Sequence, residues 1–152
     1  MSSFMSDFNI LRFLNAQESN FDKAYKEILS GRKMGHWMWF IFPQLRGLGQ
    51  SGISNEYGIS GLMEAEVFFN HEILGFRYRQ LLDVLLKSRG SDPKEIFGHV
   101  DAMKFRSSLT LFSLVDSSEI QLPKLCLEKY FFGIPDERTL KILSNKSPSK
   151  IE

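Results

Sequence analysis

The sequence is poor in cysteine, in net charge and in long apolar runs, and each shortage excludes a class of protein. Cys126 is the only cysteine, so neither an intramolecular disulfide nor a zinc site built from several thiolates can form. The 19 basic and 18 acidic side chains nearly cancel, which predicts no general binding to nucleic acid or to an anionic membrane. No apolar run approaches the roughly 20 residues that a membrane-spanning helix needs.

Several familiar motifs are also missing. The first residues, MSSFMSDFNILRF, lack the basic start, apolar segment and cleavage site of a secretory signal, so we expect a cytoplasmic protein. No phosphate-binding loop, nucleophile elbow or HExxH zinc motif occurs. The three histidines, His36, His71 and His99, are too widely spaced for a local metal site. The sequence therefore predicts neither a metal nor a cofactor.

What the sequence does contain is apolar and aromatic surface. Hydrophobic residues make up 43% of the 152 residues, and 14 residues are phenylalanine. A chain of this length can bury the core of one domain, and its apolar residues recur at helical spacing. We predict an all-α fold, a single compact domain of about seven or eight helices over residues 1–152. Its ordered core should span about 7–143, with a polar, frayed tail over 144–152.

Helix signals divide the chain into short segments. Apolar spacing and caps predict helices near residues 8–14, 21–30, 37–41, 62–70, 72–87, 93–98, 102–112 and 122–131, with a final turn after Asp136. Gly31 should end the second helix, and Asp92 followed by Pro93 should start the sixth. Ser60 is the expected cap of the helix over 62–70. The glycine-rich segment from Leu45 to Tyr57 is expected to be a loop.

The stretch from Gly31 to Gly49, GRKMGHWMWFIFPQLRGLG, contains both tryptophans inside one apolar run, Trp37 to Phe42. Pro43 ends any helix by about Ile41, and we expect a buried helix there. Its polar edges carry Arg32, Lys33 and His36 on one side and Gln44 and Arg46 on the other. They can satisfy buried backbone groups around a tryptophan core, or they can line a site in which tryptophan stacks and arginine grips an anion.

A second charged segment, DAMKFRSS, begins at Asp101. On a helix Asp101 and Lys104 lie along one face, and they form either a solvated i, i+3 pair or a carboxylate that orients a lysine toward an anion. Arg106 follows within the same segment.

These two segments, with YGI at 57–59 and FFGIPDERTL at 131–140, resemble domain-of-unknown-function family 1810, a bacterial family sometimes labelled "calpastatin". The resemblance extends from Phe8 to Leu143. It implies an all-α fold, in agreement with the periodicity, and no established catalytic activity. Inhibitory calpastatin segments are disordered, whereas this composition predicts a packed globule. The matching motif positions are His36, Trp37, Trp39, Pro43, Gln44, Arg46, Gly47, Gly49, Tyr57, Asp101, Lys104, Arg106, Gly133 and Asp136.

Three functional hypotheses remain open. The first is a cleft lined by Trp, Arg and Lys that binds a small anionic or nucleotide-like ligand, with candidate residues Trp39, Gln44, Arg46, Tyr57, Lys104 and Arg106. The second is a hydrolase such as an N-glycosidase acting on a phosphate-bearing ribosyl substrate, with His36 or Asp101 as general base. The third is a protein-interaction domain without a small-molecule site. The sequence does not decide whether the protein is an enzyme, nor its oligomeric state.

Overall fold

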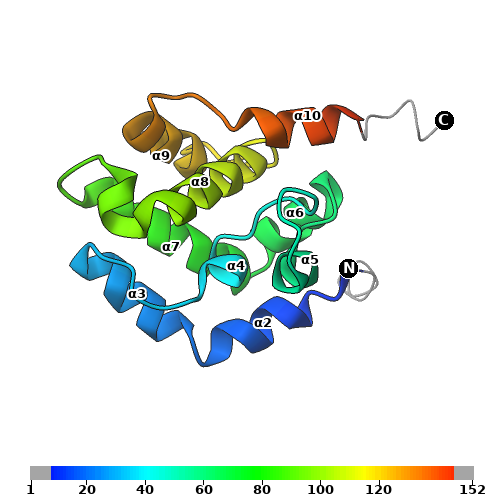
Figure 1. Cartoon of the computed structure of the whole chain (residues 1–152), viewed down its shortest axis with the longest axis horizontal. Coiled ribbons are helices and arrows are strands. Elements are labelled where there is room, and N and C mark those ends of the chain that lie inside the picture. The colour runs from blue at the N-terminus through cyan, green and yellow to red at the C-terminus, as the bar shows by residue number, and fades with distance from the viewer. Residues whose placement is uncertain (1–7, 146–152) are drawn as a thin grey trace.

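The computed structural model describes residues 8–145, and this part of the chain is helical without a β-strand (Figure 1). The helices are α2 (Leu11–Glu18), α3 (Phe21–Ser30), α4 (Met38–Ile41), α5 (Gly52–Tyr57), α6 (Leu62–Asn70), α7 (Leu74–Lys87), α8 (Pro93–Ser113), α9 (Leu122–Phe131) and α10 (Glu137–Asn145). The predicted all-α class is confirmed. Of the tail predicted to be frayed over 144–152, residues 144 and 145 belong to α10, and the rest lies outside the described residues.

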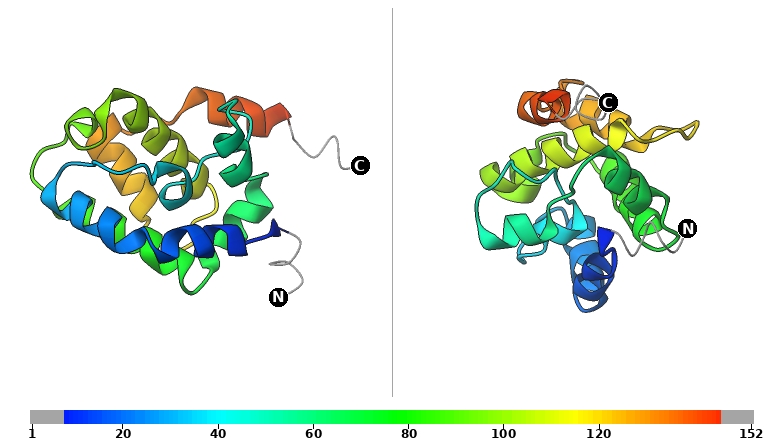
Figure 2. Two further views of the ribbon diagram at one scale, coloured as in Figure 1. Left: turned by 60° about the horizontal axis from the view of Figure 1, so that its bottom comes forward. Right: turned by 90° about the vertical axis from the view of Figure 1, so that its right-hand side faces the viewer.

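The helices are arranged so that α2 and α3 form one edge of the molecule and α9 and α10 the opposite edge (Figures 1 and 2). Between them, α7 packs against α3, α6 and α9, while α8 packs against α6, α9 and α10. The short helix α4 contacts α2 and α5. None of the helices within residues 8–145 is long and apolar enough to cross a membrane.

The core is built from aromatic rings, and Phe42 lies at its centre. The Phe42 ring packs edge-on against Phe105 and Tyr78, with centroid distances of 5.0 and 5.5 Å. Such edge-to-face pairs add about 0.5–1.5 kcal/mol beyond the area that they bury. Trp37, fully buried, packs 6.2 Å from the same ring. The apolar run of the sequence is therefore the structural centre of the domain, and α4 ends at Ile41 as predicted.

Several helix ends follow the predicted local signals. Gly31 adopts a left-handed φ of 89° at the end of α3. Asp92 accepts a hydrogen bond from the Lys94 backbone amide at the start of α8, with Pro93 in the first turn. Gly98, at φ 80°, interrupts α8 at the place where the sequence predicted one helix to end and another to begin.

Two local predictions were wrong, and one helix extends further than predicted. The segment from Leu45 to Tyr57 is not all loop, because Ser51 accepts a hydrogen bond from the Ser54 amide and opens α5. Ser60 does not cap α6, whose cap position is Gly61; instead a carboxylate in the first turn of α6 accepts a hydrogen bond from the Ser60 amide. The helix predicted near residues 8–14 overlaps α2 from Leu11 onward, and α2 continues to Glu18.

Candidate functional site

The loop between α3 and α4 is held in place by Glu27. Its Oε1 atom accepts hydrogen bonds from the backbone amides of Met34 and Gly35, at 2.7 and 2.9 Å, and from Trp37 Nε1 at 2.8 Å. Burial alone would raise the pKa of Glu27, but these hydrogen bonds outweigh it and lower the pKa. The carboxylate thereby gives the loop a defined backbone conformation.

Lys33 connects this loop to α8. Its backbone amide donates to the Ile96 carbonyl at 2.7 Å, and its Nζ donates to the Gly35 carbonyl at 2.6 Å. The same Nζ lies 2.7 Å from Asp101 Oδ2 and 5.0 Å from the centroid of the Trp37 ring. Lys33 therefore places a cation beside the Asp101 carboxylate on α8.

Asp101 receives a second lysine from its own helix. Lys104 Nζ lies 3.2 Å from Asp101 Oδ1 and 4.6 Å from the centroid of the Trp39 ring. The side chains of Lys33, Asp101 and Lys104 are 8%, 21% and 18% exposed. We call these three residues, with Trp37 and Trp39, the lysine–tryptophan cluster. Two ammonium groups share one carboxylate there, so the formal charge of the cluster is +1.

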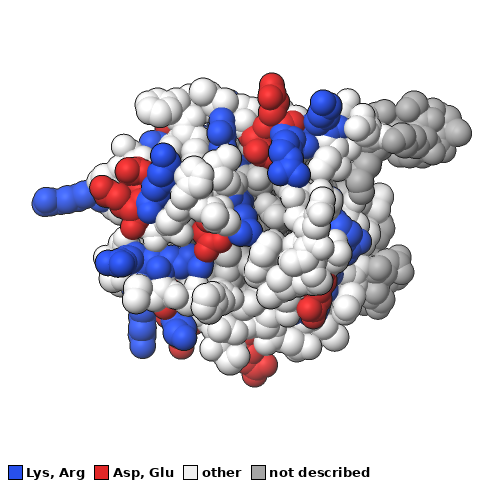
Figure 3. Space-filling view, in the orientation of Figure 1, with Lys and Arg blue, Asp and Glu red and all other residues white. Residues whose placement is uncertain are grey.

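Trp39 lies between α8 and the glycine-rich loop that follows α4. Lys104 of α8 covers its ring, and a Cβ atom placed on Gly49 would lie 3.8 Å from Trp39 Cη2. The loop is fixed from its other side by α10, because Arg138 Nη2 donates to the Leu48 carbonyl at 3.1 Å. The surface is hollowed in the middle of the face that Figure 3 shows, where α8 approaches the segment 45–60, and basic and acidic side chains lie beside the hollow.

The structure brings Trp39, Asp101 and Lys104 together and places other candidate residues elsewhere. His36 is exposed on the loop before α4, and within residues 8–145 no hydrogen bond or ion pair joins it to Asp101. Arg106 donates from Nε to the Ile134 carbonyl at 2.9 Å, away from Lys104. Side chains two residues apart on a helix point in directions that differ by about 200°, so Lys104 and Arg106 face different surroundings.

The remaining candidates belong to the segment 44–59. Gln44 is buried, and its carbonyl accepts a hydrogen bond from the Ile59 amide at 2.9 Å. Arg46 is exposed and donates from Nη2 to the Gly58 carbonyl at 3.0 Å. Tyr57 packs 5.3 Å from the Phe40 ring, and burial raises the pKa of its hydroxyl. These residues shape the backbone beside the lysine–tryptophan cluster.

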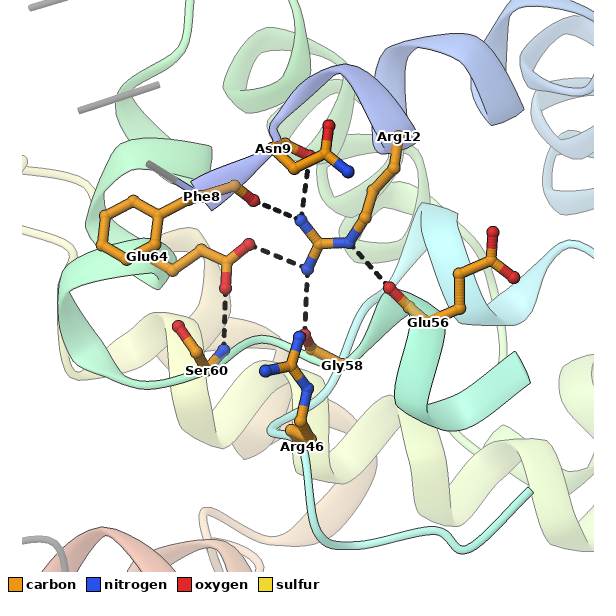
Figure 4. Close-up of polar contacts among 8 residues, drawn as sticks. All are labelled: Phe8, Asn9, Arg12, Arg46, Glu56, Gly58, Ser60 and Glu64. Atoms are coloured by element: carbon orange, nitrogen blue, oxygen red, sulfur yellow. Dashed lines mark hydrogen bonds and ion pairs between the residues drawn. The ribbon is translucent and has the colours of Figure 1, made fainter. Parts of the chain in front are cut away.

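Arg12 and Glu64, which the sequence analysis did not select, form a second ion cluster between α2 and α6 (Figure 4). Arg12 donates four hydrogen bonds of 2.6–3.0 Å to carbonyl oxygens, and these belong to Phe8, Asn9, Glu56 and Gly58. Its Nη2 lies 2.8 Å from Glu64 Oε2, while the other Glu64 oxygen accepts from the Ser60 amide. The two side chains are 11% and 2% exposed.

The Arg12–Glu64 pair holds three separate segments together. Glu64 Oε2 accepts no well-aligned hydrogen bond within the described residues, so its contact with Arg12 is an ion pair in the strict sense. Every nitrogen of the Arg12 side chain is engaged by the protein itself. Four of the five N–H donors of Arg12 go to backbone carbonyls and Nη2 also pairs with Glu64, so we interpret the pair as structural.

No group of three or more histidine, cysteine, aspartate or glutamate side chains is placed to hold a metal ion within residues 8–145.

The sequence matches the family described as "Protein of unknown function (DUF1810)" over residues 7–143. The chain belongs to the DUF1810 family. It is also similar to the crystal structure of the conserved hypothetical protein Rv1873 from Mycobacterium tuberculosis, with 40% identity and a TM-score of 0.87 over 91% of this chain and 98% of that one.

A search of curated proteins finds no match to the chain. The resemblance to the DUF1810 family that the tryptophan motif indicated is thus confirmed, and the family description assigns no activity. Function has to be inferred from the site itself.

Proposed function

We propose that this protein binds a small anionic, nucleotide-like ligand at the lysine–tryptophan cluster. The observation that supports this is the ratio of two ammonium groups to one carboxylate, in side chains that are at most 21% exposed. A positive charge that is partly removed from water attracts an anion more strongly than a fully solvated lysine does. Trp39, which is half-buried, adds aromatic surface of the kind on which a base or ribose packs.

The glycine-rich loop suits the approach of such a ligand. Gly49 lies so close to Ser54 that an added Cβ would be 2.9 Å from that side chain, so the backbone there stays bare. A bare backbone beside a cation and an indole ring can contact a phosphate or sugar directly. This arrangement favours a ligand with both a charged and a flat part.

Thermal unfolding in the presence of inorganic phosphate, adenosine monophosphate and ADP-ribose tests the proposal. At 100 times Kd a ligand stabilises the fold by about 2.7 kcal/mol, which raises Tm by several degrees. We expect these ligands to raise the Tm of the wild-type protein but not the Tm of the Lys104→Met variant. Lys87→Met, which removes an exposed lysine paired with Asp83, is the matched control, and ligand should still raise its Tm.

The outcomes separate the parts of the proposal. A Tm rise with both nucleotides but not with phosphate alone supports nucleotide-like recognition, whereas equal rises support binding of the anionic group only. If no phosphate-bearing compound shifts Tm at millimolar concentration, the proposed site is wrong. The hydrolase alternative stays a prediction, and chromatography of ADP-ribose after incubation with the protein tests it by detecting cleavage products. A protein-interaction role and a cytoplasmic location also stay predictions.

A further inference from the structure

A cavity apart from the lysine–tryptophan cluster opens between the start of α8 and the end of α9. Its volume is about 540 Å³, and apolar side chains form most of its wall. These are Pro93, Ala102, Met103, Phe131, Phe132 and Ile134. A volume of this size lies within the range of about 300–1,000 Å³ that small-molecule sites occupy.

Phe132 is held at the edge of this cavity in an unfavourable state. Its backbone is left-handed, with φ 57° and ψ 26°, a conformation that is costly for a residue with a Cβ atom. The capping hydrogen bond to the Leu127 carbonyl at the end of α9 offsets part of that cost, but the Phe132 ring is 91% exposed and gains no packing energy within the chain. A strained backbone that presents an apolar ring to solvent is typical of a ligand site.

Arg106 supplies the charge in this cavity. Its Nε donates to the Ile134 carbonyl at 2.9 Å, and its guanidinium carbon lies 5.6 Å from the Phe131 ring centroid. Among residues 8–145, no acceptor engages its Nη1 or Nη2, which together form a fork that matches a carboxylate. Lys94 adds a second cation to the wall, and the acid beside it, Asp92, uses one carboxylate oxygen to cap α8.

We propose that this cavity binds a small amphipathic anion, a flat apolar body that carries one carboxylate. The body would cover Phe132 and Met103, and the carboxylate would pair with the two terminal nitrogens of Arg106. This site is separate from the lysine–tryptophan cluster, because Lys104 and Arg106 project from α8 about 200° apart. The two proposals therefore stand or fall independently.

Calorimetric titration with naphthalene carboxylate, and with the uncharged naphthalene carboxamide, tests the charge requirement. The two probes share their apolar body and differ only in the group that Arg106 would bind. We expect the carboxylate to bind about tenfold more tightly than the amide, which corresponds to one good charge-assisted contact. Arg106→Met should remove that difference, whereas Lys104→Met should leave it unchanged.

Phe132→Gly tests the role of the strained ring. Glycine adopts the left-handed conformation without strain, so the substitution should leave Tm unchanged or raise it. We expect it to weaken binding of the carboxylate probe by about tenfold, as the loss of a covering aromatic ring would. A ring with a purely structural role would give the opposite pattern, a lower Tm with unchanged binding.

Two results would overturn the inference. One is the absence of binding of naphthalene carboxylate to wild type at millimolar concentration. The other is equal affinity of wild type, Arg106→Met and Phe132→Gly for that probe. Because neither variant touches the lysine–tryptophan cluster, nucleotide binding to both is expected to continue whichever result is found.

Discussion

The Arg12–Glu64 pair and the lysine–tryptophan cluster are both largely buried, but they differ in charge balance. The Arg12–Glu64 pair is formally neutral, and the protein's own carbonyl oxygens take up the other hydrogen bonds of the guanidinium group. The lysine–tryptophan cluster instead places two lysines on one aspartate. Both join segments that are distant in sequence. The comparison leads us to propose that an excess of one sign of charge, rather than burial of charge alone, distinguishes a binding site from a structural pair.

The two clusters differ in how fully their charges are compensated. In the Arg12–Glu64 pair, removal of either partner leaves a buried charge without compensation, which is strongly unfavourable. In the lysine–tryptophan cluster, two ammonium groups share one carboxylate, the neutral Gly35 carbonyl and the faces of two indole rings, and such cation–π contacts contribute about 0.5–2 kcal/mol each. A ligand anion would complete that second cluster, whereas the first is already complete.

The largest effect is expected for Glu64→Gln. The substitution keeps the shape of the side chain but leaves Arg12 buried without a counter-charge, which should lower the free energy of unfolding by about 3–5 kcal/mol. Urea denaturation at neutral pH measures this change. Glu66→Gln, on the exposed side of the same helix, is the control and should change it by less than about 0.5 kcal/mol. A loss below about 1 kcal/mol for Glu64→Gln would show that the pair is dispensable.

A smaller loss, about 1–3 kcal/mol, is expected for Asp101→Asn. Lys33 and Lys104 would then be left without their shared carboxylate, and the charge of the cluster would rise to +2. Added phosphate should recover more Tm in this variant than in wild type, because the anion replaces the missing negative charge. Asp83→Asn, which breaks the exposed pair with Lys87, is the control. Equal Tm values for the two variants, with and without phosphate, would contradict the assigned role.

Glu27→Gln should cost about 1 kcal/mol at pH 7, and the cost should vanish in acid. Hydrogen bonds in the folded state lower the pKa of Glu27 below its ordinary value of 4.5. The unfolded chain therefore binds the proton more readily, so stability from this group is present above pH 4.5 and is lost as pH falls through the folded pKa. Unfolding of wild type and variant between pH 2 and pH 7, in about six steps, measures the difference. A constant difference across that range would show that the carboxylate charge has no role.

Signals that act within one helical turn were readable from the sequence. Gly31, Asp92 and Asp136 end or start helices through hydrogen bonds and backbone angles set by their immediate neighbours. The Asp101–Lys104 contact was also predictable, since i, i+3 neighbours meet on any helix. The same helical geometry separates Lys104 from Arg106, although the sequence analysis placed both in one cleft.

Residues whose partners are distant in sequence were not identified. Arg12 contacts Gly58, 46 positions later, and no spacing pattern connects the two. Glu27 and Lys33 likewise have partners that no local spacing pattern indicates, Trp37 and Asp101. A loop rich in unpaired backbone amides immediately after α3 was the available hint for Glu27, because such amides need acceptors. The packing of α3 against α7 and the contact of Lys33 with α8 depend on the whole fold.

The smallest effect on stability is expected for Lys104→Met. This variant also tests most directly whether the difference in charge between the two clusters matters for binding. The substitution turns the lysine–tryptophan cluster into a neutral one-to-one pair of Lys33 and Asp101, equivalent in charge to Arg12 and Glu64. The methionine side chain keeps contact with the Trp39 ring, so we expect a change of less than about 1 kcal/mol in the free energy of unfolding. If excess charge distinguishes a site from a structural pair, this nearly silent variant should lose the Tm rise with adenosine monophosphate that wild type shows. A variant that kept that rise would show that the second lysine is structural too.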